Sequence, residues 1–502
     1  MKKIRNGMFA LIAVVLMSGF VFGGCSWFDG EGPEVYQAET FYMNGQTYDY
    51  VIDNNEELKM LVWHTILYRK NNVKFYLNYS AGDLNTQVGK FIYDPNNDQN
   101  TYPEYDGLNV LFYTSGSQAG KIYTRVVKNA GGQVWQLQNF TYYLNNDFTL
   151  STANATASDV SHISTGGKPT LMQFRTTHSQ PTKDHDFDME YIQGTPDTRT
   201  FPIDDVETEV EVYNTTQLFM AAQYGAKPIF TNTTSVAYTV YQNARTILGQ
   251  INNSDALTDY EKALNIYNYI VQNVTYDHVL FDYMDEISDD SVYSFGNFGV
   301  FHLEGVLYDL DDQVAVCDGL SKAFALMCRI EGIYSTKVNG MAGNPGAQGK
   351  HAWNEIGLDG EYHWVDTTWG MAYWYDSGTS TLYEYASRSY FLVDDNLPSH
   401  TSEFVVGSNN VTDYNYFEKL TVNHNSEDVS HLVGSVVQLN KLIEYYTDLA
   451  STIGHSVSFE IKLTNAGYTD ILSHGGLGGT LSGVEYIENF LPDGKFVAIY
   501  VP

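Results

Sequence analysis

One cysteine stands where a helix is predicted to begin, a position that suits a nucleophile. From Leu320 to Cys328 the apolar residues recur at helical spacing, and Gly332 follows as a stop signal, so a helix is predicted to begin at or near Cys317. The positive end of the helix dipole stabilises a thiolate, and we therefore expect a lowered pKa for the Cys317 thiol. Such a thiol could attack a carbonyl carbon if a base lay beside it.

Cys328, on the same predicted helix, is explained most simply as a small core residue. It follows Cys317 by eleven positions, which is about 16 Å along a continuous helix. A disulfide needs Cα atoms within about 7 Å, so these two cysteines are not expected to pair. The Cys317 thiol should therefore be free.

A base and an orienting carboxylate are predicted on a hairpin downstream of the cysteine. Two stretches that alternate as strands flank an Asp-Gly turn signal at 359–360. With a two-residue turn there, Leu358 pairs with Glu361, and Asp366 becomes the diagonal neighbour of His351, about 7 Å away between side-chain roots. A register slip of one residue would move Asp366 to the opposite face. A lone histidine would be interpreted as structural, whereas His351 in this setting is interpreted as a general base.

Three segments around these residues resemble the transglutaminase-like superfamily, whose members share a papain-like core with a Cys-His-Asp triad. The matching segments are residues 316–319 (VCDG), 351–355 (HAWNE) and 364–369 (WVDTTW). The strand pattern at 390–393 (YFLV) and the following His400 also resemble the part that often closes such domains. Two departures are visible, Leu320-Ser321 where Tyr-Ala is frequent and Thr367 where Pro is frequent. They lie beside the triad and bear on substrate contacts.

The resemblance implies that Cys317 is the nucleophile, His351 its base and Asp366 the group that orients the base. The chemistry would be acyl transfer, in which the thiolate attacks an amide carbonyl, an amine leaves and a thioester remains. Water would complete hydrolysis, and a second amine would complete a cross-link. The backbone N–H of Cys317 is an expected oxyanion donor.

Trp353, Trp364 and Trp369 are candidate walls of the substrate pocket, although core packing explains each of them about as well. No metal site or cofactor is expected. Three aspartates at 309, 311 and 312 precede the cysteine, but they lack the spacing of an EF-hand loop and are better explained as a solvated loop.

The elements that would position these residues predict an α+β fold. The core would be papain-like, a helix bearing the cysteine packed on an antiparallel sheet bearing the histidine and the aspartate. Residues 251–402 are the expected catalytic domain, after a β-rich α+β region at 35–250 that could divide near 178–201, and before a small α+β domain at 403–502. Helices are also predicted near 215–224, 235–251 and 259–274, and a hairpin is predicted at 41–48 before a helix that starts near residue 55.

The N-terminus predicts export. Three basic residues precede an apolar run at 8–22, which is shorter than the ~20 residues of a membrane-spanning helix. Gly23, Gly24 and Cys25 follow, an arrangement that resembles a bacterial lipoprotein signal. Cleavage would remove residues 1–24 and leave Cys25 as a lipid-modified N-terminus on a tether at 25–34, outside the cytoplasm. The alternative is an ordinary signal peptide with an incidental cysteine.

Composition excludes several classes of protein. The 502 residues include 27 Lys and Arg against 60 Asp and Glu, a net charge of -33, which argues against binding to nucleic acid and against charge-driven binding to anionic lipid. Three cysteines are too few for a disulfide scaffold. The oligomeric state is open.

Two functions remain. The first is a lipid-anchored thiol enzyme acting on amide bonds of extracellular peptides or proteins, as protease, amidase or cross-linker. The second is an inactive surface-binding or scaffold lipoprotein that uses a transglutaminase-like domain. The complete triad favours the enzyme.

Overall fold

The computed structural model describes residues 40–43, 46–67, 73–80, 125–128, 134–138, 177–212, 215–287, 299–343, 349–393, 400–401, 416–491 and 494–502. The chain consists of two compact units, residues 1–39 and residues 40–502, and only the second unit contains described residues. The predicted signal peptide and the tether, Cys25 included, lie outside them. Within the described ranges, no helix is both long and apolar enough to cross a bilayer.

The first described segment contains the predicted hairpin and the helix after it. Strands β1 (Thr40–Met43) and β2 (Gln46–Asp49) pair antiparallel, which confirms the hairpin, and α1 (Asn55–Leu67) begins after Asn54, whose side chain accepts the backbone N–H of Glu57 at 3.0 Å. A sheet in the order β3-β4-β6-β5 follows. Its strands are β3 (Val51–Ile52), β4 (Val73–Leu77), β5 (Arg125–Lys128) and β6 (Val134–Gln138).

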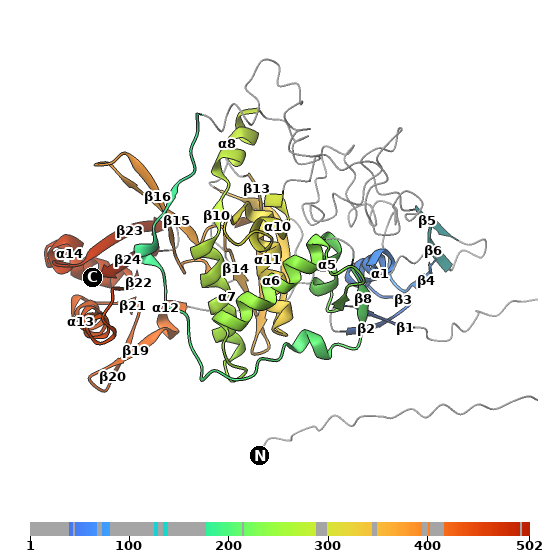
Figure 1. Cartoon of the computed structure of the whole chain (residues 1–502), viewed down its shortest axis with the longest axis horizontal. Coiled ribbons are helices and arrows are strands. Elements are labelled where there is room, and N and C mark those ends of the chain that lie inside the picture. The colour runs from blue at the N-terminus through green and yellow to red at the C-terminus, as the bar shows by residue number, and fades with distance from the viewer. Residues whose placement is uncertain are drawn as a thin grey trace, which may run out of the picture. The chain divides into compact units, whose positions relative to one another are not determined.

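Helices precede the cysteine along the chain (Figure 1). The predicted ones are α5 (Thr215–Gln223), α6 (Val236–Ile251) and α7 (Asp259–Asn273), and α8 (His278–Ile287), which was not predicted, follows them. Ser235 caps α6, and Thr258 and Glu261 form a capping box on α7. Short elements connect them: η4 (His185–Phe187), η5 (Pro202–Asp205), β8 (Glu209–Glu211), β9 (Lys227–Ile229), β10 (Thr275–Tyr276), η6 (Gly299–Phe301), α10 (Glu304–Leu307) and β11 (Val314–Ala315).

A five-stranded antiparallel sheet and helix α11 (Cys317–Ile330) form the core that carries the predicted triad. The sheet order is β17-β14-β13-β12-β18, with strands β12 (Tyr334–Ala342), β13 (Gly349–Leu358), β14 (Glu361–Val365), β17 (Phe391–Val393) and β18 (His400–Thr401). Leu358 pairs with Glu361 in the predicted register, and the turn residues Asp359 and Gly360 both have positive φ, 53° and 82°. The predicted fold, a cysteine-bearing helix on an antiparallel sheet, is confirmed.

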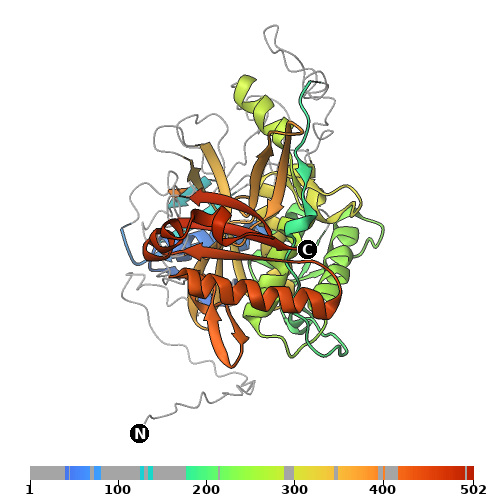
Figure 2. The same cartoon turned by 90° about the vertical axis from the view of Figure 1, so that its left-hand side faces the viewer.

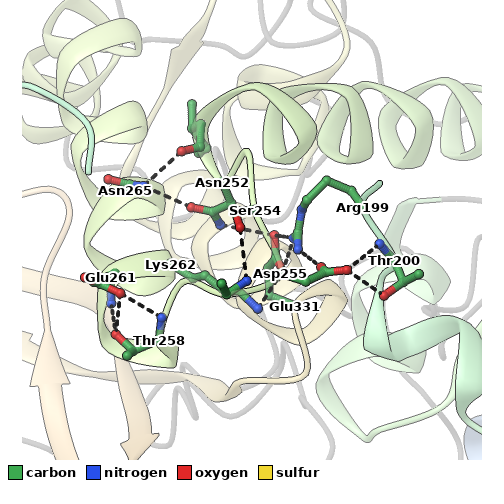
Figure 3. A network of polar contacts seen from close by, with 12 residues as sticks. Arg199, Thr200, Asn252, Ser254, Asp255, Thr258, Glu261, Lys262, Asn265 and Glu331 are labelled. Carbon is green, nitrogen blue, oxygen red and sulfur yellow. Dashed lines mark hydrogen bonds and ion pairs between the residues drawn. The ribbon is translucent and has the colours of Figure 1, made fainter. Parts of the chain in front are cut away.

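The segment at 178–201, where the N-terminal region could divide, is tied to the core by polar contacts (Figure 3). Arg199 pairs with Asp255 and, at 2.5 Å, with Glu331, which is only 2% exposed. Glu331 is the C-cap residue of α11, and its carboxylate also accepts a hydrogen bond from Asn252 Nδ2 at 3.1 Å. Asn265 in turn donates to the carbonyl of Ile251. The network therefore fixes the C-terminal end of α11 against the junction of α6 and α7.

The C-terminal part is an α+β layer. Its sheet has the order β21-β22-β24-β23 and its long helix α13 packs on it, as Figure 2 shows in orange and red. The elements are α12 (Tyr416–Lys419), β19 (Thr421–His424), β20 (Glu427–Ser430), β21 (Leu432–Val433), α13 (Val436–Ile453), β22 (Val457–Leu463), α14 (Asn465–Ser473), α15 (Gly476–Thr480), β23 (Glu485–Leu491) and β24 (Gly494–Val501). A further sheet, β15 (Met371–Asp376), β16 (Thr381–Ala386) and β7 (Thr182–Lys183), contacts the C-terminal sheet through apolar residues. The proposed domain boundaries at 250 and 402 stay predictions.

Candidate active site

The cysteine lies at the first position of α11, with its thiol beside the strand that carries the histidine. Val316 is the N-cap residue in extended conformation, and its carbonyl accepts the N–H of Leu320 at 3.0 Å. Cys317 is half-buried, and the backbone N–H of Ala352 on β13 hydrogen-bonds its sulfur. Ala352 directly follows His351, so this contact brings the thiol next to the predicted base.

Close packing explains why residue 319, the last of the 316–319 segment, is glycine. A Cβ at Gly319 would lie 2.4 Å from the carbonyl oxygen of Val300 and 3.0 Å from that of His302. Only glycine permits the backbone around η6 to approach the first turn of α11 this closely. Glycine at the last position of the 316–319 segment is therefore also required for packing at the start of α11.

The histidine and the aspartate are in direct contact. His351 Nε2 lies 2.7 Å from Asp366 Oδ2, and both side chains are buried. The other carboxylate oxygen, Oδ1, accepts the backbone N–H groups of Thr368 at 2.8 Å and Trp369 at 3.0 Å. A second imidazole, His400 Nε2, lies 2.9 Å from Oδ2. The diagonal proximity predicted from the hairpin register is observed.

These contacts determine where His351 carries its proton. The two histidines hold the pKa of Asp366 well below its usual range, against the opposing effect of burial, so the carboxylate is ionised and only accepts. His351 must then donate through Nε2–H. In the neutral ring Nδ1 keeps its lone pair, and among the described residues it has no hydrogen-bond partner. That nitrogen is available to take a proton.

The expected low pKa of Cys317 is wrong for this geometry. Burial raises the pKa of the thiol to about 12, and the carboxylate of Asp318 adds to the increase. The Ala352 N–H and Lys337 lower the pKa of the thiol, but by less. Desolvation of the thiolate thus outweighs the helix dipole, which is a partial charge at a partly buried site. The thiol is protonated at rest and needs a base to attack.

A buried charge cluster, which we call the Asp318 cluster, lies directly behind the nucleophile. The Asp318 carboxylate pairs with Lys322 of α11 and with Lys337 of β12, and all three side chains are at most 5% exposed. Lys322 also donates to the carbonyl of Phe301 at 2.7 Å. The two lysines lower the pKa of Asp318 to about 2 despite its burial. The sequence reasoning missed this cluster; an Asp and a Lys four residues apart on a predicted helix were its one local signal.

Of the three predicted pocket tryptophans, Trp353 and Trp369 lie beside the two histidines, and Trp364 packs against Trp353. Trp353 and Trp364 are buried, with 1% and 6% exposure, in a core cluster with Val338 and Tyr390. Trp369 is partly buried against the same cluster. Trp353 stacks on His351 with ring centroids 5.9 Å apart. In this arrangement the rings of Trp353 and Trp364 pack the core, and Trp369 is the one left partly open to solvent.

The imidazole and carboxylate groups of the site are also possible metal ligands. One group of three His, Cys, Asp or Glu side chains among the described residues has ligand atoms close enough together to hold an ion, within 4.8 Å, and it consists of His351, Asp366 and His400. The Nε2 atoms of the two histidines already form hydrogen bonds of 2.7 and 2.9 Å with Asp366 Oδ2. A positioned acid–base pair explains the arrangement without an ion.

The residues of the site lie in a part of the chain that is similar to known proteins. Residues 247–368 match the family model of the transglutaminase-like superfamily. Kyphoscoliosis peptidase of Mus musculus and of Homo sapiens is in each case 32% identical over 105 residues, covering 18% of this chain and 16% of the relative. The chain thus spans less than a fifth of the length of these curated relatives.

Two solved structures show weak likenesses. One, described as a TGase, is 19% identical with a TM-score of 0.22, covering 28% of this chain and 34% of that chain. The other, from Cytophaga hutchinsonii and assigned as a cysteine protease, is 20% identical with a TM-score of 0.16, covering 26% of this chain and 36% of that chain. TM-scores this low support no statement about this chain. The family match over 247–368 includes Cys317, His351 and Asp366, so this chain carries a domain of the transglutaminase-like superfamily.

Proposed function

We propose that the chain is an exported thiol enzyme that acts on amide bonds of peptides or proteins through a cysteine thioester. One observation carries the proposal. Asp366, fixed by four donors, holds the Nε2 side of His351. Among the described residues the other ring nitrogen of His351 has no hydrogen-bond partner, and the next residue, Ala352, contacts the Cys317 sulfur. A positioned base beside a thiol is the arrangement that nucleophilic catalysis requires.

The raised pKa of the thiol defines the order of steps. As the sulfur of Cys317 attacks the substrate carbonyl carbon, His351 Nδ1 takes the thiol proton, and Asp366 stabilises the resulting imidazolium. The negative charge on the carbonyl oxygen develops beside the first turn of α11, whose backbone N–H groups have no intrahelical acceptors. His351 then gives the proton to the leaving amine, and the thioester remains. Water or a second amine releases the acyl group and restores the thiol.

The similarity to kyphoscoliosis peptidase supports the substrate class, because a peptidase acts on peptide amides. The inactive scaffold is the second candidate, and the observation that favours it is the pKa of about 12 for the Cys317 thiol. A thiol with this pKa does not react near neutral pH unless His351 takes its proton during the attack.

A peptide library tests the proposal. Residues 26–502 are purified and incubated with the library, with and without a primary amine, beside Cys317→Ala. We expect cleaved or deamidated peptides without the amine and amine-linked products with it, and none from the variant. Mass spectrometry should also detect an acyl adduct on Cys317. If wild type and variant give the same products, or neither gives any, the scaffold function is favoured.

We also propose that lipid on Cys25 anchors the protein to the outer side of the cytoplasmic membrane. The basic and apolar residues before Cys25 support this proposal. In a bacterial host, Cys25→Ala is expected to release the protein from the membrane fraction, or to leave it as an uncleaved precursor, with loss of label from a tagged fatty acid. Cys328→Ala is the matched control and should keep both anchor and label. An unchanged fatty-acid label on Cys25→Ala would contradict the anchor.

A further inference from the structure

Two histidines share one oxygen of the Asp366 carboxylate. His351 Nε2 lies 2.7 Å and His400 Nε2 2.9 Å from Oδ2, and the His400 side chain is only 1% exposed. We propose that His400 is a positioning residue of the site, which fixes the Asp366 carboxylate and limits how strongly that carboxylate binds the His351 ring. This inference rests on the proposed thiol chemistry, because His400 acts through Asp366 and does not touch the reacting atoms.

Strand order brings His400 to this position from 34 residues beyond Asp366. His400 lies on β18, which pairs with β12 opposite Ala342, on the side of β12 away from β13. On β12, Gly340 stands opposite His351. Because alternate residues of a strand share a face, Gly340, Ala342 and both histidines belong to one face of the sheet. With no side chain at Gly340, the two rings can approach across β12, and their centroids are 5.2 Å apart.

Aromatic side chains fix the orientation of the His400 ring. Its centroid lies 4.5 Å from that of Trp369 and 4.9 Å from that of Trp353, both nearly edge to face. The same two tryptophans flank His351, at 6.0 and 5.9 Å. The two imidazoles are thus held as one packed unit, and neither can turn away from Asp366 without displacing a tryptophan. This packing also gives the two tryptophans a role beside the triad.

The shared oxygen has a chemical consequence. An ionised carboxylate accepts only, so both rings must carry their proton on Nε2. Each donor takes part of the electron density of Oδ2, and the hydrogen bond from His400 therefore weakens the one that stabilises charged His351. His400 thus keeps His351 from being held in the protonated form, in which it cannot act as a base. Since Thr368 and Trp369 occupy Oδ1, Asp366 has no other free oxygen to offer.

Other titratable groups around Asp366 do not obscure this effect. Cys317 from α11 and Tyr267 from α7 interact electrostatically with the carboxylate. Burial raises the pKa of Cys317 to about 12 and raises the pKa of Tyr267 well above its usual value. Both stay protonated between pH 5 and pH 9. A change of rate in that range therefore reports the unit of two histidines and one carboxylate.

The test compares His400→Phe, which keeps ring volume and loses the donor, with His400→Gln, which keeps a neutral N–H donor. The readout is the pH dependence of Cys317 alkylation by iodoacetamide, followed by mass spectrometry on residues 26–502. For His400→Phe we expect the acid limb to move up by about half a pH unit and the maximal rate to fall about tenfold. His400→Gln should return both toward wild type. A merely structural role would leave the limb unmoved in His400→Phe, and that result would overturn the inference.

The two proposals fail in different ways. If His351→Ala alkylates as fast as wild type, the proposed function fails whatever the His400 variants do. If alkylation depends on His351 but both His400 variants match wild type, this inference alone is overturned. Nitrogen NMR of histidine-labelled wild type provides a second test that needs no variant to fold. We expect His400 to carry a proton on Nε2 from pH 6 to pH 8, and an unprotonated Nε2 contradicts the inference.

Discussion

Asp366→Asn is expected to lower the rate of acyl transfer by about 10³- to 10⁴-fold near pH 7. The carboxylate accepts four donors: two backbone N–H groups on Oδ1, and the Nε2 atoms of His351 and His400 on Oδ2. An asparagine side chain has one oxygen and one NH2 group, so the NH2 group must lie against N–H groups that donate to the carboxylate in the wild type. The simplest relief is for a ring to move its proton to Nδ1. In His351 that change removes the lone pair that takes the proton of the thiol.

The pH dependence of Asp366→Asn separates loss of the base from loss of the fold. Without a competent base, attack requires the thiolate itself, and the thiol pKa of about 12 leaves little thiolate at pH 7. The rate of the variant should therefore rise about tenfold per pH unit between pH 7 and pH 10. Wild type, whose base is in place, should show a much weaker pH dependence over this range. Measured as iodoacetamide alkylation of Cys317, the rate deficit should thus shrink as the pH rises.

His351→Ala is the matched control for this experiment. It should show the same steep pH dependence, and the double variant should be no slower than either single variant, because the two residues act as one unit. A deficit below tenfold for Asp366→Asn, or a deficit that is constant with pH, would contradict the assigned roles.

The sequence was sufficient for features that local chemistry determines. The Asp-Gly turn at 359–360 requires two residues with positive φ, and this requirement fixed the register that places Asp366 near His351. The start of α11 at Cys317 followed from the apolar spacing and from Gly332, which has φ 79°. These predictions needed no knowledge of which distant segments pack together.

The features that the sequence could not predict depend on strand order and on burial. His400 reaches Asp366 only because β18 pairs with the far side of β12, and no local pattern specifies that neighbour. Lys337 likewise meets Asp318 through the packing of β12 on α11. The pKa of Cys317 was predicted from the helix dipole alone, whereas the degree of desolvation that decides it is set by the whole core.

Asp318→Asn is expected to lower the free energy of unfolding by about 3–5 kcal/mol, the largest stability effect that we predict for the site. The change leaves the ammonium groups of Lys322 and Lys337 buried without their shared counterion. Lys337→Met is the matched control. It leaves Asp318 paired with Lys322 and replaces a buried charge with an apolar chain of similar length, so the expected cost is under about 1 kcal/mol.

The same cluster predicts how stability depends on pH. The folded-state pKa of Asp318 is depressed to about 2 from the ordinary value of 3.8, so its contribution is complete above pH 4 and is lost as the pH falls toward 2. Asp318→Asn should lose this acid sensitivity. Urea unfolding followed by tryptophan fluorescence measures it, since Trp353 and Trp369 lie beside the histidines of the site. Equal losses in Asp318→Asn and Lys337→Met would show that packing, and not the shared counterion, holds the start of α11.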